Sequence, residues 1–459
     1  MIQKRLKAIE QMTGGKGLSP SYDDITIEGV SIDSRTVKPG NLFIPLIRQL
    51  DGHHYVEEAI AKGAAASLWQ TDHPSPPHHL PLIYVDDGLQ ALQKLAAAYR
   101  GELPVTTIAV TGSNGKTTTK DILTSVLQTN YRVHKTLGNL NSQIGVPLTL
   151  LEIDKDSEVA VIEMGMSERG QIDRLSRMVQ PDIAVITMIG VSHLSTLGSR
   201  EEIANAKLEI VNGLKDGGTL IYNGDEPLLA ERVQEVIGSN AVSLIRIGEA
   251  EHNEYRAEII KSDAEGSSFK VRKEEFHLPI LGAHNISNAL CATAAAYQLG
   301  LGPEQVAEGF TLLQVTKMRM EKIDAPRGFT ILNDAWNASP VSMASAIETF
   351  QDLPGYIRKF AVLGDMLELG PKEQEFHREI GWSLDPRRMD YVYTVGELAA
   401  HIAQEAAKRF PEGKVKAFAS KEEAAEELWQ NLNPQDLVLV KGSRGMQLES
   451  MVSRLMQSP

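Results

Sequence analysis

The residues best suited to chemistry stand at positions 112 to 118, where the chain reads Gly-Ser-Asn-Gly-Lys-Thr-Thr. Glycines allow backbone N–H groups to crowd around phosphate oxygens, and the helix that begins after them adds partial positive charge. In such a loop, Lys116 reaches the outer phosphates and the hydroxyl of Thr117 binds Mg²⁺. Two residues separate the glycines where four are usual, so a plain glycine turn is the alternative. The pattern predicts an ATP-consuming enzyme whose nucleotide-binding residues are Gly112, Ser113, Asn114, Gly115, Lys116, Thr117 and Thr118.

Two further side chains are expected at the same edge of a sheet. Glu163 ends the next apolar stretch, Val-Ala-Val-Ile, and His193 follows the stretch after that. The carboxyl ends of neighbouring parallel strands meet at one sheet edge, which is where such a loop also lies. A carboxylate there can help Thr117 to hold the metal. Each residue alone is equally well explained as polar surface, but together with the loop they favour Mg²⁺ ligands.

The elements that must position these residues form a repeated strand–helix pattern between about residues 104 and 315. The apolar stretches are continuous rather than alternating, as in a parallel sheet covered on both faces. A domain of this kind binds its ligands beyond the carboxyl ends of its strands. The expected strands are 107–110, 159–162 and 183–189, and the expected helices are 116–128, 170–178, 201–214 and 285–299.

Two other segments flank this pattern. Residues 1–103 combine short strands, two helices and a Pro/His cluster at 72–81. They end in Gly-Glu-Leu-Pro, which is typical of a linker because proline disfavours helix in the residue before it. From about residue 316 the strand–helix pattern restarts, so three domains are predicted, 1–103, 104–315 and 316–459. The outer domains are expected to contain strands 25–27, 42–44, 82–85, 329–332, 360–363, 391–395 and 437–440 and helices 55–62, 89–99 and 342–350.

Composition excludes several classes of function. A chain of 459 residues is too long for one hydrophobic core, and 42% apolar with 23% charged residues is ordinary for globular protein. The formal charge of −14 argues against a nucleic-acid partner, because phosphate backbones need a basic surface. The single cysteine, Cys291, lies in an alanine-rich run and is expected to be a small buried residue. We expect no membrane insertion and a cytoplasmic location, because the sequence shows neither a long apolar run nor a secretory signal.

Several strings of residues resemble the Mur ligases, ATP-dependent amide-forming enzymes of peptidoglycan precursor synthesis, over essentially the whole chain. The loop at 111–118 is similar to the family's phosphate loop, and Gly-Ala-His-Asn-Ile-Ser-Asn-Ala at 282–289 is similar to its purine-contacting segment. Strings at 138–147, 333–340, 363–370 and 441–444 resemble the branch of the family that adds D-alanyl-D-alanine. The resemblance implies an α/β fold of three domains: a small N-terminal nucleotide-sugar domain, a central P-loop ATPase-like parallel sheet and a C-terminal Rossmann-like domain.

The resemblance also implies roles for residues that match the family's motifs. Asn285 would contact the adenine, within the segment that also holds Asn288. Arg319 would contact the terminal phosphate and Asp334 the ribose. Lys207 matches a lysine that similar enzymes carry as a carbamate, an anion that helps to hold Mg²⁺; an unmodified surface lysine is the alternative. The implied catalytic residues are Lys116, Lys207, Arg319 and His193, and the implied metal ligands are Thr117, Glu163, His193 and Lys207.

Substrate contacts are implied mainly in the two outer domains. Ser34 and Arg35 would serve the uridine diphosphate end of one substrate, and Lys441 and Arg444 the carboxylate of an incoming dipeptide. Solvent-facing polar residues would look the same in both places. His377 is expected to support a fold contact rather than chemistry. The implied substrate-binding residues are Ser34, Arg35, Asn139, Asn141, Asn337, Lys441 and Arg444.

The implied reaction joins D-alanyl-D-alanine to UDP-N-acetylmuramoyl-tripeptide through an acyl phosphate, with ATP and Mg²⁺, in a chain expected to be a monomer. Three alternatives stay open: a sister ligase that adds a single amino acid, a nucleotide-dependent switch and a non-catalytic scaffold. The chain departs from the family pattern at 44–50, which is one residue short and lacks a glycine. It also carries Trp336 and Ser339 where tyrosine and asparagine are commoner. These departures concern substrate contacts rather than the reaction class.

Overall fold

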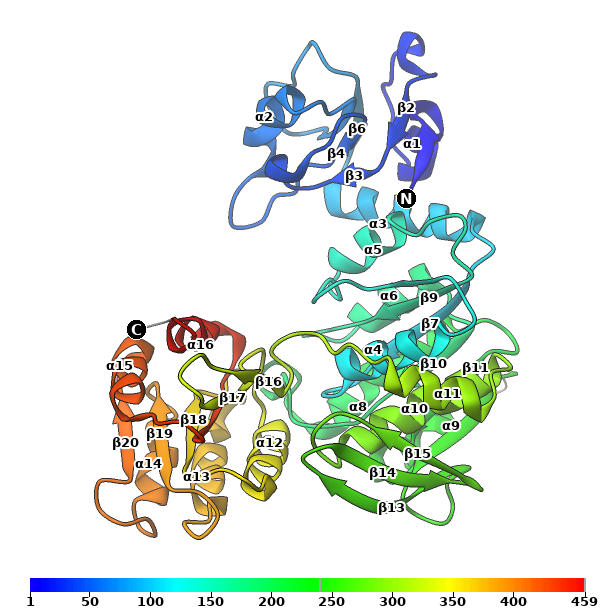
Figure 1. The fold of residues 1–459 in the computed structure, drawn as a ribbon. Coiled ribbons are helices and arrows are strands. Elements are labelled where there is room, and N and C mark those ends of the chain that lie inside the picture. Colours follow the sequence, from blue (N-terminus) through cyan, green and yellow to red (C-terminus); the bar gives the residue numbers. More distant parts are fainter. Residues whose placement is uncertain (239–240, 458–459) are drawn as a thin grey trace.

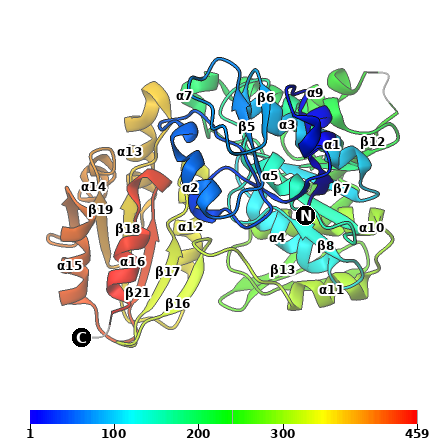
Figure 2. The ribbon, with the colours of Figure 1, turned by 90° about the horizontal axis from the view of Figure 1, so that it is seen from above.

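The computed structural model describes residues 1–238 and 241–457, which form three α/β domains around separate sheets (Figure 1). The N-terminal domain, blue in Figure 1, stacks on one end of the central domain. The C-terminal domain, yellow to red, stands beside the central domain, as the view from above in Figure 2 also shows. The α/β class and the plan of three domains that the sequence predicts are therefore confirmed.

The N-terminal domain is built on a four-stranded parallel sheet. Its apolar residues continue into the core of the central domain: Leu92 and Leu95 belong to the same buried cluster as Val146 and Leu150. The N-terminal domain is therefore anchored on the central domain through a shared core. In the order in which they pair, the strands are β3 Val30–Ser31, β4 Leu42–Phe43, β5 Ala66–Gln70 and β6 Leu82–Val85. The domain also contains an antiparallel ribbon of β1 Gln3–Arg5 and β2 Thr26–Glu28, and its helices are α1 Leu6–Thr13, α2 Val56–Ala61 and α3 Gly88–Glu102.

The central domain contains a nine-stranded sheet with a parallel core. Ile108 and Val161 pack into one buried layer and Ala109 and Ile162 into the other, so both faces of the sheet are covered. Continuous apolar strands follow from this two-sided burial. In the order in which they pair, the strands are β15 Glu274–Leu278, β14 Gly266–Val271, β13 Tyr255–Asp263, β12 Ser243–Gly248, β11 Thr219–Asn223, β10 Ile183–Ile186, β7 Thr106–Thr111, β9 Val159–Glu163 and β8 Val133–Lys135.

The central domain differs from the sequence prediction in its helices and at one edge of its sheet. The stretch expected to be helical from 201 to 214 is helix α8, Arg200–Leu208, followed by a separate 3₁₀ turn, Glu209–Gly213. Antiparallel strands β13, β14 and β15 extend the parallel sheet, and the sequence patterns did not predict them. The helices are α4 Lys116–Leu127, α5 Gly145–Leu151, α6 Gln171–Val179, α7 Leu194–Leu197, α8 Arg200–Leu208, α9 Pro227–Ile237, α10 Asn285–Gln298 and α11 Pro303–Thr311.

The C-terminal domain is a six-stranded sheet with helices on both faces. Only its edge strand β16 is antiparallel. In the order in which they pair, the strands are β16 Glu321–Asp324, β17 Thr330–Asp334, β21 Leu437–Lys441, β18 Lys359–Gly364, β19 Tyr391–Val395 and β20 Val415–Phe418. The helices are α12 Pro340–Asp352, α13 Glu373–Ser383, α14 Ala400–Ala406, α15 Lys421–Asn431 and α16 Glu449–Leu455.

Side chains at the helix starts explain where several of these elements begin. Ser339 precedes Pro340 and accepts a hydrogen bond from the Ser342 amide, which caps α12. Ser199 and Asp87 cap α8 and α3 in the same way. Such caps satisfy N–H groups that have no partner inside the helix and stabilise it by about 1 kcal/mol each. The α12 cap also fixes Ser339 at the boundary with the central domain.

Candidate active site

The loop between β7 and α4 has the geometry of a phosphate cradle. Gly112 and Gly115 have φ of 149° and 81°. A Cβ at Gly112 would lie 1.9 Å from Oγ1 of Thr187, and one at Gly115 would lie 2.3 Å from Oδ1 of Asn288. Both glycines are therefore required by close approach, which a plain surface turn does not demand. The hydroxyl of Ser113 is buried and has no hydrogen-bond partner in the described part of the chain.

Lys116 is half-buried at the start of α4 and folds back onto this loop. Its Nζ donates to the carbonyl oxygens of Gly112 at 2.7 Å and Ser113 at 3.2 Å. Burial lowers the pKa of Lys116 to about 8, against the opposing effect of Glu163 and with a further lowering by Arg319. An anion in the loop would offset this cost, because it supplies the negative charge that the buried ammonium lacks.

Glu163 lies beside the loop, as the sheet-edge argument predicted. Its Oε1 accepts hydrogen bonds from Nδ2 of Asn141 at 2.7 Å and from Oγ1 of Thr117 at 3.3 Å. Its Oε2 is buried and has no hydrogen-bond partner among the residues described. A buried carboxylate oxygen next to a hydroxyl is a donor set that suits a hard cation such as Mg²⁺. Asn141, expected to contact substrate, thus lies against this carboxylate.

Lys207 and His193 lie in the same electrostatic environment. Lys207 is buried, and burial together with Lys116 holds its pKa well below the ordinary value of lysine, against Glu209 and Glu163. Its Nζ makes neither a hydrogen bond nor an ion pair with any residue of 1–238 or 241–457. His193 has a φ of 63°, and its Nδ1 lies 2.6 Å from Oε2 of Glu368 in the C-terminal domain. The expected catalytic histidine therefore also bridges two domains.

A cleft of about 590 Å³ separates the central and C-terminal domains. Asn285 and Asn288 border it from α10, and their side chains hold each other through a 2.8 Å hydrogen bond. Two residues that the sequence analysis did not single out, Thr187 and Met320, also line it. Thr187 follows β10, Ile183–Ile186, directly, but the expected strand 183–189 ran past it and so hid its position at the strand end. Of the predicted site residues, the cleft is lined by Asn114, Gly115, Thr118, Asn285, Asn288, Arg319, Asp334, Asn337 and Lys441.

The wall of the cleft on the C-terminal side is charged. Arg319 donates from Nη2 to Oγ1 of Thr117 at 3.4 Å, which links this wall to the phosphate loop. Asp334 accepts a 3.2 Å hydrogen bond from the Met320 amide and a 2.6 Å one from Nζ of Lys441. Asp334 and Lys441, expected to serve two different substrates, thus form one ion pair.

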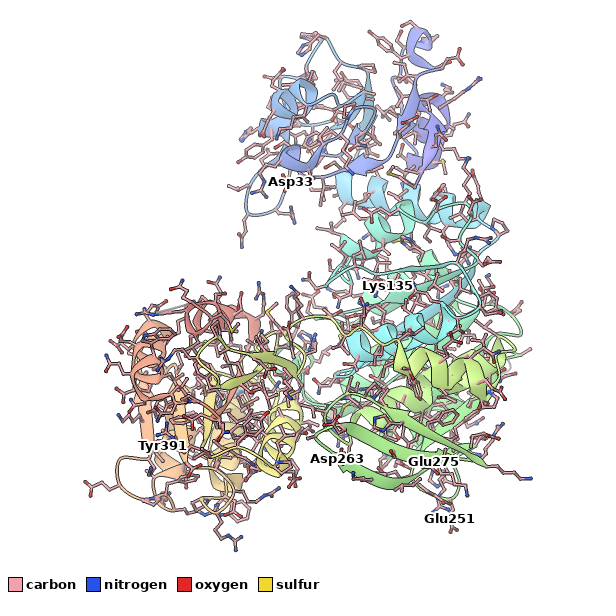
Figure 3. The ribbon with its side chains drawn as sticks, in the orientation of Figure 1. Asp33, Lys135, Glu251, Asp263, Glu275 and Tyr391 are labelled. Atoms are coloured by element: carbon pink, nitrogen blue, oxygen red, sulfur yellow. The ribbon has the colours of Figure 1, made fainter. Side chains whose placement is uncertain are left out.

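Five predicted substrate residues lie outside the cleft, and Asn141, which bonds Glu163, is one of them. Ser34 donates to Oε2 of Glu58 at 2.8 Å, and Arg35 is paired with Asp33 at 2.7 Å in the N-terminal domain. Figure 3 labels Asp33 at the lower edge of that domain, on the side toward the C-terminal domain. Asn139 is exposed beyond β8. Arg444 stacks on Trp336, with its guanidinium carbon 4.8 Å from the ring centroid.

Two minor expectations are confirmed. His377 is fully buried, accepts from the Met366 amide at 2.9 Å and lies 2.6 Å from the Glu373 carbonyl, which is a fold contact. Cys291 is fully buried in α10, and burial raises the pKa of its thiol to about 12. Neither residue lines the cleft.

Comparison with known proteins identifies the family. Family models match three consecutive segments: the Mur ligase family catalytic domain at residues 26–100, the Mur ligase middle domain at 110–296 and the Mur ligase glutamate ligase domain at 318–444. The UDP-N-acetylmuramoyl-tripeptide–D-alanyl-D-alanine ligase of Bacillus subtilis is 48% identical over the full length of both chains. The chain belongs to the Mur ligase family.

Solved structures agree with this Mur ligase in fold. The MurF structure from Acinetobacter baumannii matches all of the chain, with all of its own chain covered, a TM-score of 0.89 and 30% identity. The MurF ligase from Thermotoga maritima, solved in complex with ADP, matches 94% of the chain and 97% of its own, with a TM-score of 0.80 and 28% identity. Within the described residues of this Mur ligase, no helix is both long and apolar enough to cross a membrane.

Proposed function

We propose that this Mur ligase joins D-alanyl-D-alanine to UDP-N-acetylmuramoyl-tripeptide, with conversion of ATP to ADP and phosphate. The observation that carries the proposal is the 48% identity, over the full length of both chains, to a ligase named for this reaction. The geometry supports it independently, because a phosphate cradle, a buried carboxylate and a cleft between two domains lie together. A ligase needs such a cleft to bring a phosphate donor and an amine to one carboxyl group.

ATP is proposed to lie in the cleft with its phosphates over the glycine loop. The relative from Thermotoga maritima binds ADP. We propose that Asn285 and Asn288, which line the cleft, contact the adenine and that Asp334 holds a ribose hydroxyl. Lys116 is proposed to exchange its two loop carbonyls for the outer phosphates. The phosphates of the nucleotide would thereby supply the negative charge that the buried ammonium of Lys116 lacks.

Mg²⁺ is the proposed metal, held by Glu163 and Thr117 with His193 nearby. The fit rests on Oε2 of Glu163, which is buried and has no protein partner in the described residues. When bound, the ion would neutralise charge on the phosphates. Thr117 already donates to this carboxylate, so the two oxygen donors need little rearrangement.

Lys207 is proposed to be carbamylated. Its lowered pKa favours the neutral amine, whose lone pair can attack carbon dioxide. The new N–C bond forms as one C=O π bond opens, and the nitrogen then loses a proton to water. A carbamate anion replaces a buried, unpaired amine, which suits the neighbourhood of a cation better than an ammonium.

The proposed mechanism activates the peptide carboxylate as an acyl phosphate. A carboxylate oxygen attacks the γ-phosphorus and ADP leaves; Lys116 and Arg319 stabilise the charge on the transferring group. The dipeptide amine then attacks the acyl carbon, loses a proton and displaces phosphate. We propose that Ser34 and Arg35 bind the uridine diphosphate end, and that Arg35 exchanges Asp33 for a phosphate.

The acceptor is proposed to bind against the C-terminal domain. Asn337, Lys441 and Arg444 are the candidates for its carboxylate, while Asn139 and Asn141 serve the peptide end. Each cation already has a carboxylate partner, Asp334 for Lys441 and Glu449 for Arg444, and we favour Arg444 because its side chain is half-exposed whereas that of Lys441 is buried. We propose that the domain of residues 1–103 binds the UDP-sugar peptide and that residues 104–315 bind ATP. Residues 316–459 are proposed to bind the dipeptide. We further propose that the chain acts as a monomer in the cytoplasm, where ATP is supplied.

The test is phosphate release by the purified chain with ATP, MgCl₂ and UDP-N-acetylmuramoyl-tripeptide. D-alanyl-D-alanine should release phosphate and add one dipeptide mass to the product, whereas N-acetyl-D-alanyl-D-alanine, which lacks the nucleophile, should do neither. Release with a single amino acid in place of the dipeptide would support the sister ligase. ADP formed without any acceptor would support a nucleotide switch, and full activity of Lys116→Ala would support a scaffold.

A further inference from the structure

The N-terminal domain carries a side-chain cluster that the proposed reaction does not use. Asp51 ends the shortened loop, His53 follows it in a 3₁₀ turn, and His73 belongs to the Pro/His cluster at 72–81. One ligand atom from each of the three residues lies within 4.8 Å of the others. The rings of His53 and His73 stack with centroids 4.0 Å apart, and Trp69 meets both edge-on. These contacts gather the three side chains, and because the two rings lie within 10° of parallel, one ring must turn for both nitrogens to bind one ion in their ring planes.

Asp51 is fixed as an anion at the centre of the cluster. Its Oδ1 accepts from the His53 amide at 2.9 Å and lies 2.8 Å from Nδ1 of His53. Burial alone would raise the pKa of Asp51, but hydrogen bonds from the His53 amide and from both imidazoles lower the pKa to about 2. Near neutral pH, the carboxylate therefore presents a full negative charge to the two rings.

The ring of His73 is held in place by its own backbone. Its Nδ1 lies 2.9 Å from the Pro74 carbonyl, which can only accept a hydrogen bond, so Nδ1 is the donor. Its Nε2 lies 2.9 Å from Oδ2 of Asp51, the contact through which this imidazole hydrogen-bonds the carboxylate. A divalent cation can take the place of the proton in that contact, with Nε2 and Oδ2 as two of its ligands. Metal-ligating histidines characteristically donate their second nitrogen to a backbone carbonyl in this way.

We propose that Asp51, His73 and His53 form a binding site for a zinc-type divalent cation, separate from the site at Glu163. Two imidazoles and one carboxylate favour Zn²⁺, Co²⁺ or Ni²⁺ over Mg²⁺, which prefers oxygen ligands. Three protein ligands leave a fourth, tetrahedral position open to water. Bound metal ties the 72–81 loop to the turn that follows the shortened loop at 44–50.

His53 is the weakest of the three ligands. The Gln70 amide approaches its Nε2 at 3.4 Å, so in the metal-free ring Nδ1 carries the proton and donates to Asp51. Metal at Nδ1 places that proton on Nε2, where it faces the Gln70 amide, so the ring must turn out of its stack with His73 and this amide loses its acceptor. Loss of His73 is therefore expected to weaken binding more than loss of His53.

The first test is spectroscopic and needs no variant. Chelator-treated, full-length protein is titrated with CoCl₂ while visible absorption is recorded, and ZnCl₂ is then added. We expect the intense d–d bands of tetrahedral cobalt to saturate at one equivalent and zinc to abolish them. Failure of tetrahedral bands to appear at one equivalent overturns the proposal.

The second test assigns the ligands. Zinc affinity is measured by competition with a chromophoric chelator for the wild type, His73→Gln, His53→Gln and the control His78→Gln. His78 is an exposed histidine in the same loop, so it matches the substitution without touching the cluster. We expect His73→Gln to weaken zinc binding by more than about tenfold, and His78→Gln to leave it unchanged. Equal affinity of His73→Gln and the wild type, with both folded by circular dichroism, overturns the proposal.

Discussion

The ammonium of Lys441 donates to Oδ2 of Asp334 at 2.6 Å, at the wall of the cleft between the central and C-terminal domains. Both residues are buried, and Lys441 also donates to the Asn337 carbonyl at 3.0 Å. Strands β17 and β21 place Asp334 directly opposite Lys441 in their parallel register. The pair therefore belongs to the framework of the cleft before any ligand binds.

The first prediction concerns this pair. Lys441→Met leaves Asp334 as a buried carboxylate without its counter-ion, so the free energy of unfolding should fall by about 3–5 kcal/mol. Lys372→Met, at an exposed lysine of the same domain, should change it by less than about 0.5 kcal/mol. Urea unfolding followed by circular dichroism measures both. A loss below about 1 kcal/mol for Lys441→Met would show that solvent reaches Asp334 and that the pair is not structural.

The second prediction concerns the close approach at Gly115. Alanine there must adopt a φ of 81° and place its Cβ 2.3 Å from Oδ1 of Asn288. Asn288 cannot simply yield, because it also bonds Oγ1 of Thr119 and Oδ1 of Asn285. Backbone strain of about 1–3 kcal/mol should distort the loop and raise the Kd for an ATP analogue at least about tenfold. Calorimetric titration measures this, with Gly101→Ala as the control because nothing lies within 4 Å of its added Cβ. Equal Kd values for the two variants would contradict the prediction.

The third prediction concerns the unpartnered oxygen of Glu163. Glu163→Gln keeps an oxygen that can accept from Asn141 and Thr117 but replaces the anionic Oε2 with an amide. The MgCl₂ concentration for half-maximal activity should rise about 10–100-fold. Activity is measured against MgCl₂ at saturating ATP, and Glu168→Gln, at an exposed position, serves as the control. An unchanged magnesium requirement would remove Glu163 from the set of ligands.

The position of Glu163 beside the phosphate loop could be predicted because the carboxyl ends of neighbouring parallel strands meet at one sheet edge. Strands β7 and β9 are adjacent and parallel, and their register places Val110 opposite Glu163. A residue at the end of one strand must therefore lie beside the loop that follows the other. The buried strands of the sheets were recognisable for the same reason, since two-sided burial makes them continuously apolar.

The Asp334–Lys441 pair could not be predicted in this way. The two residues are 107 positions apart, and strand order, not periodicity, makes β17 and β21 neighbours. Strand β13 was missed for a different reason: from Glu258 to Lys261 every residue is exposed, so it has no apolar run. The predicted domain boundaries and the individual substrate contacts stay predictions.

The fourth prediction concerns Cys291. Its thiol is fully buried with a pKa raised to about 12, so at pH 8 almost none of it is the reactive thiolate. Ellman's reagent should therefore not react with the native protein at pH 8 and should release one equivalent in guanidinium chloride. Full reaction of the folded protein within minutes would contradict both the burial and the raised pKa.

The fifth prediction concerns Trp336, whose ring makes cation–π contacts with two arginines. The guanidinium carbon of Arg444 is 4.8 Å and that of Arg319 is 5.9 Å from the ring centroid. Each cation–π contact contributes about 0.5–1 kcal/mol, and Arg319 reaches Thr117 of the phosphate loop from this position. Trp336→Leu should therefore lower kcat roughly tenfold with little change in ATP affinity, because it loosens the orientation of the arginines rather than the adenine contacts.

Two matched variants separate this role from simple loss of bulk. Trp336→Tyr keeps an aromatic face and should retain most of the activity, whereas Trp382→Leu removes a tryptophan that is 71% exposed and should have no effect. Steady-state kinetics with phosphate release as the readout gives kcat and KM for each. If Trp336→Tyr loses as much kcat as Trp336→Leu, the aromatic ring does not position the arginines, because Tyr keeps the π face that both cation–π contacts require and Leu removes it.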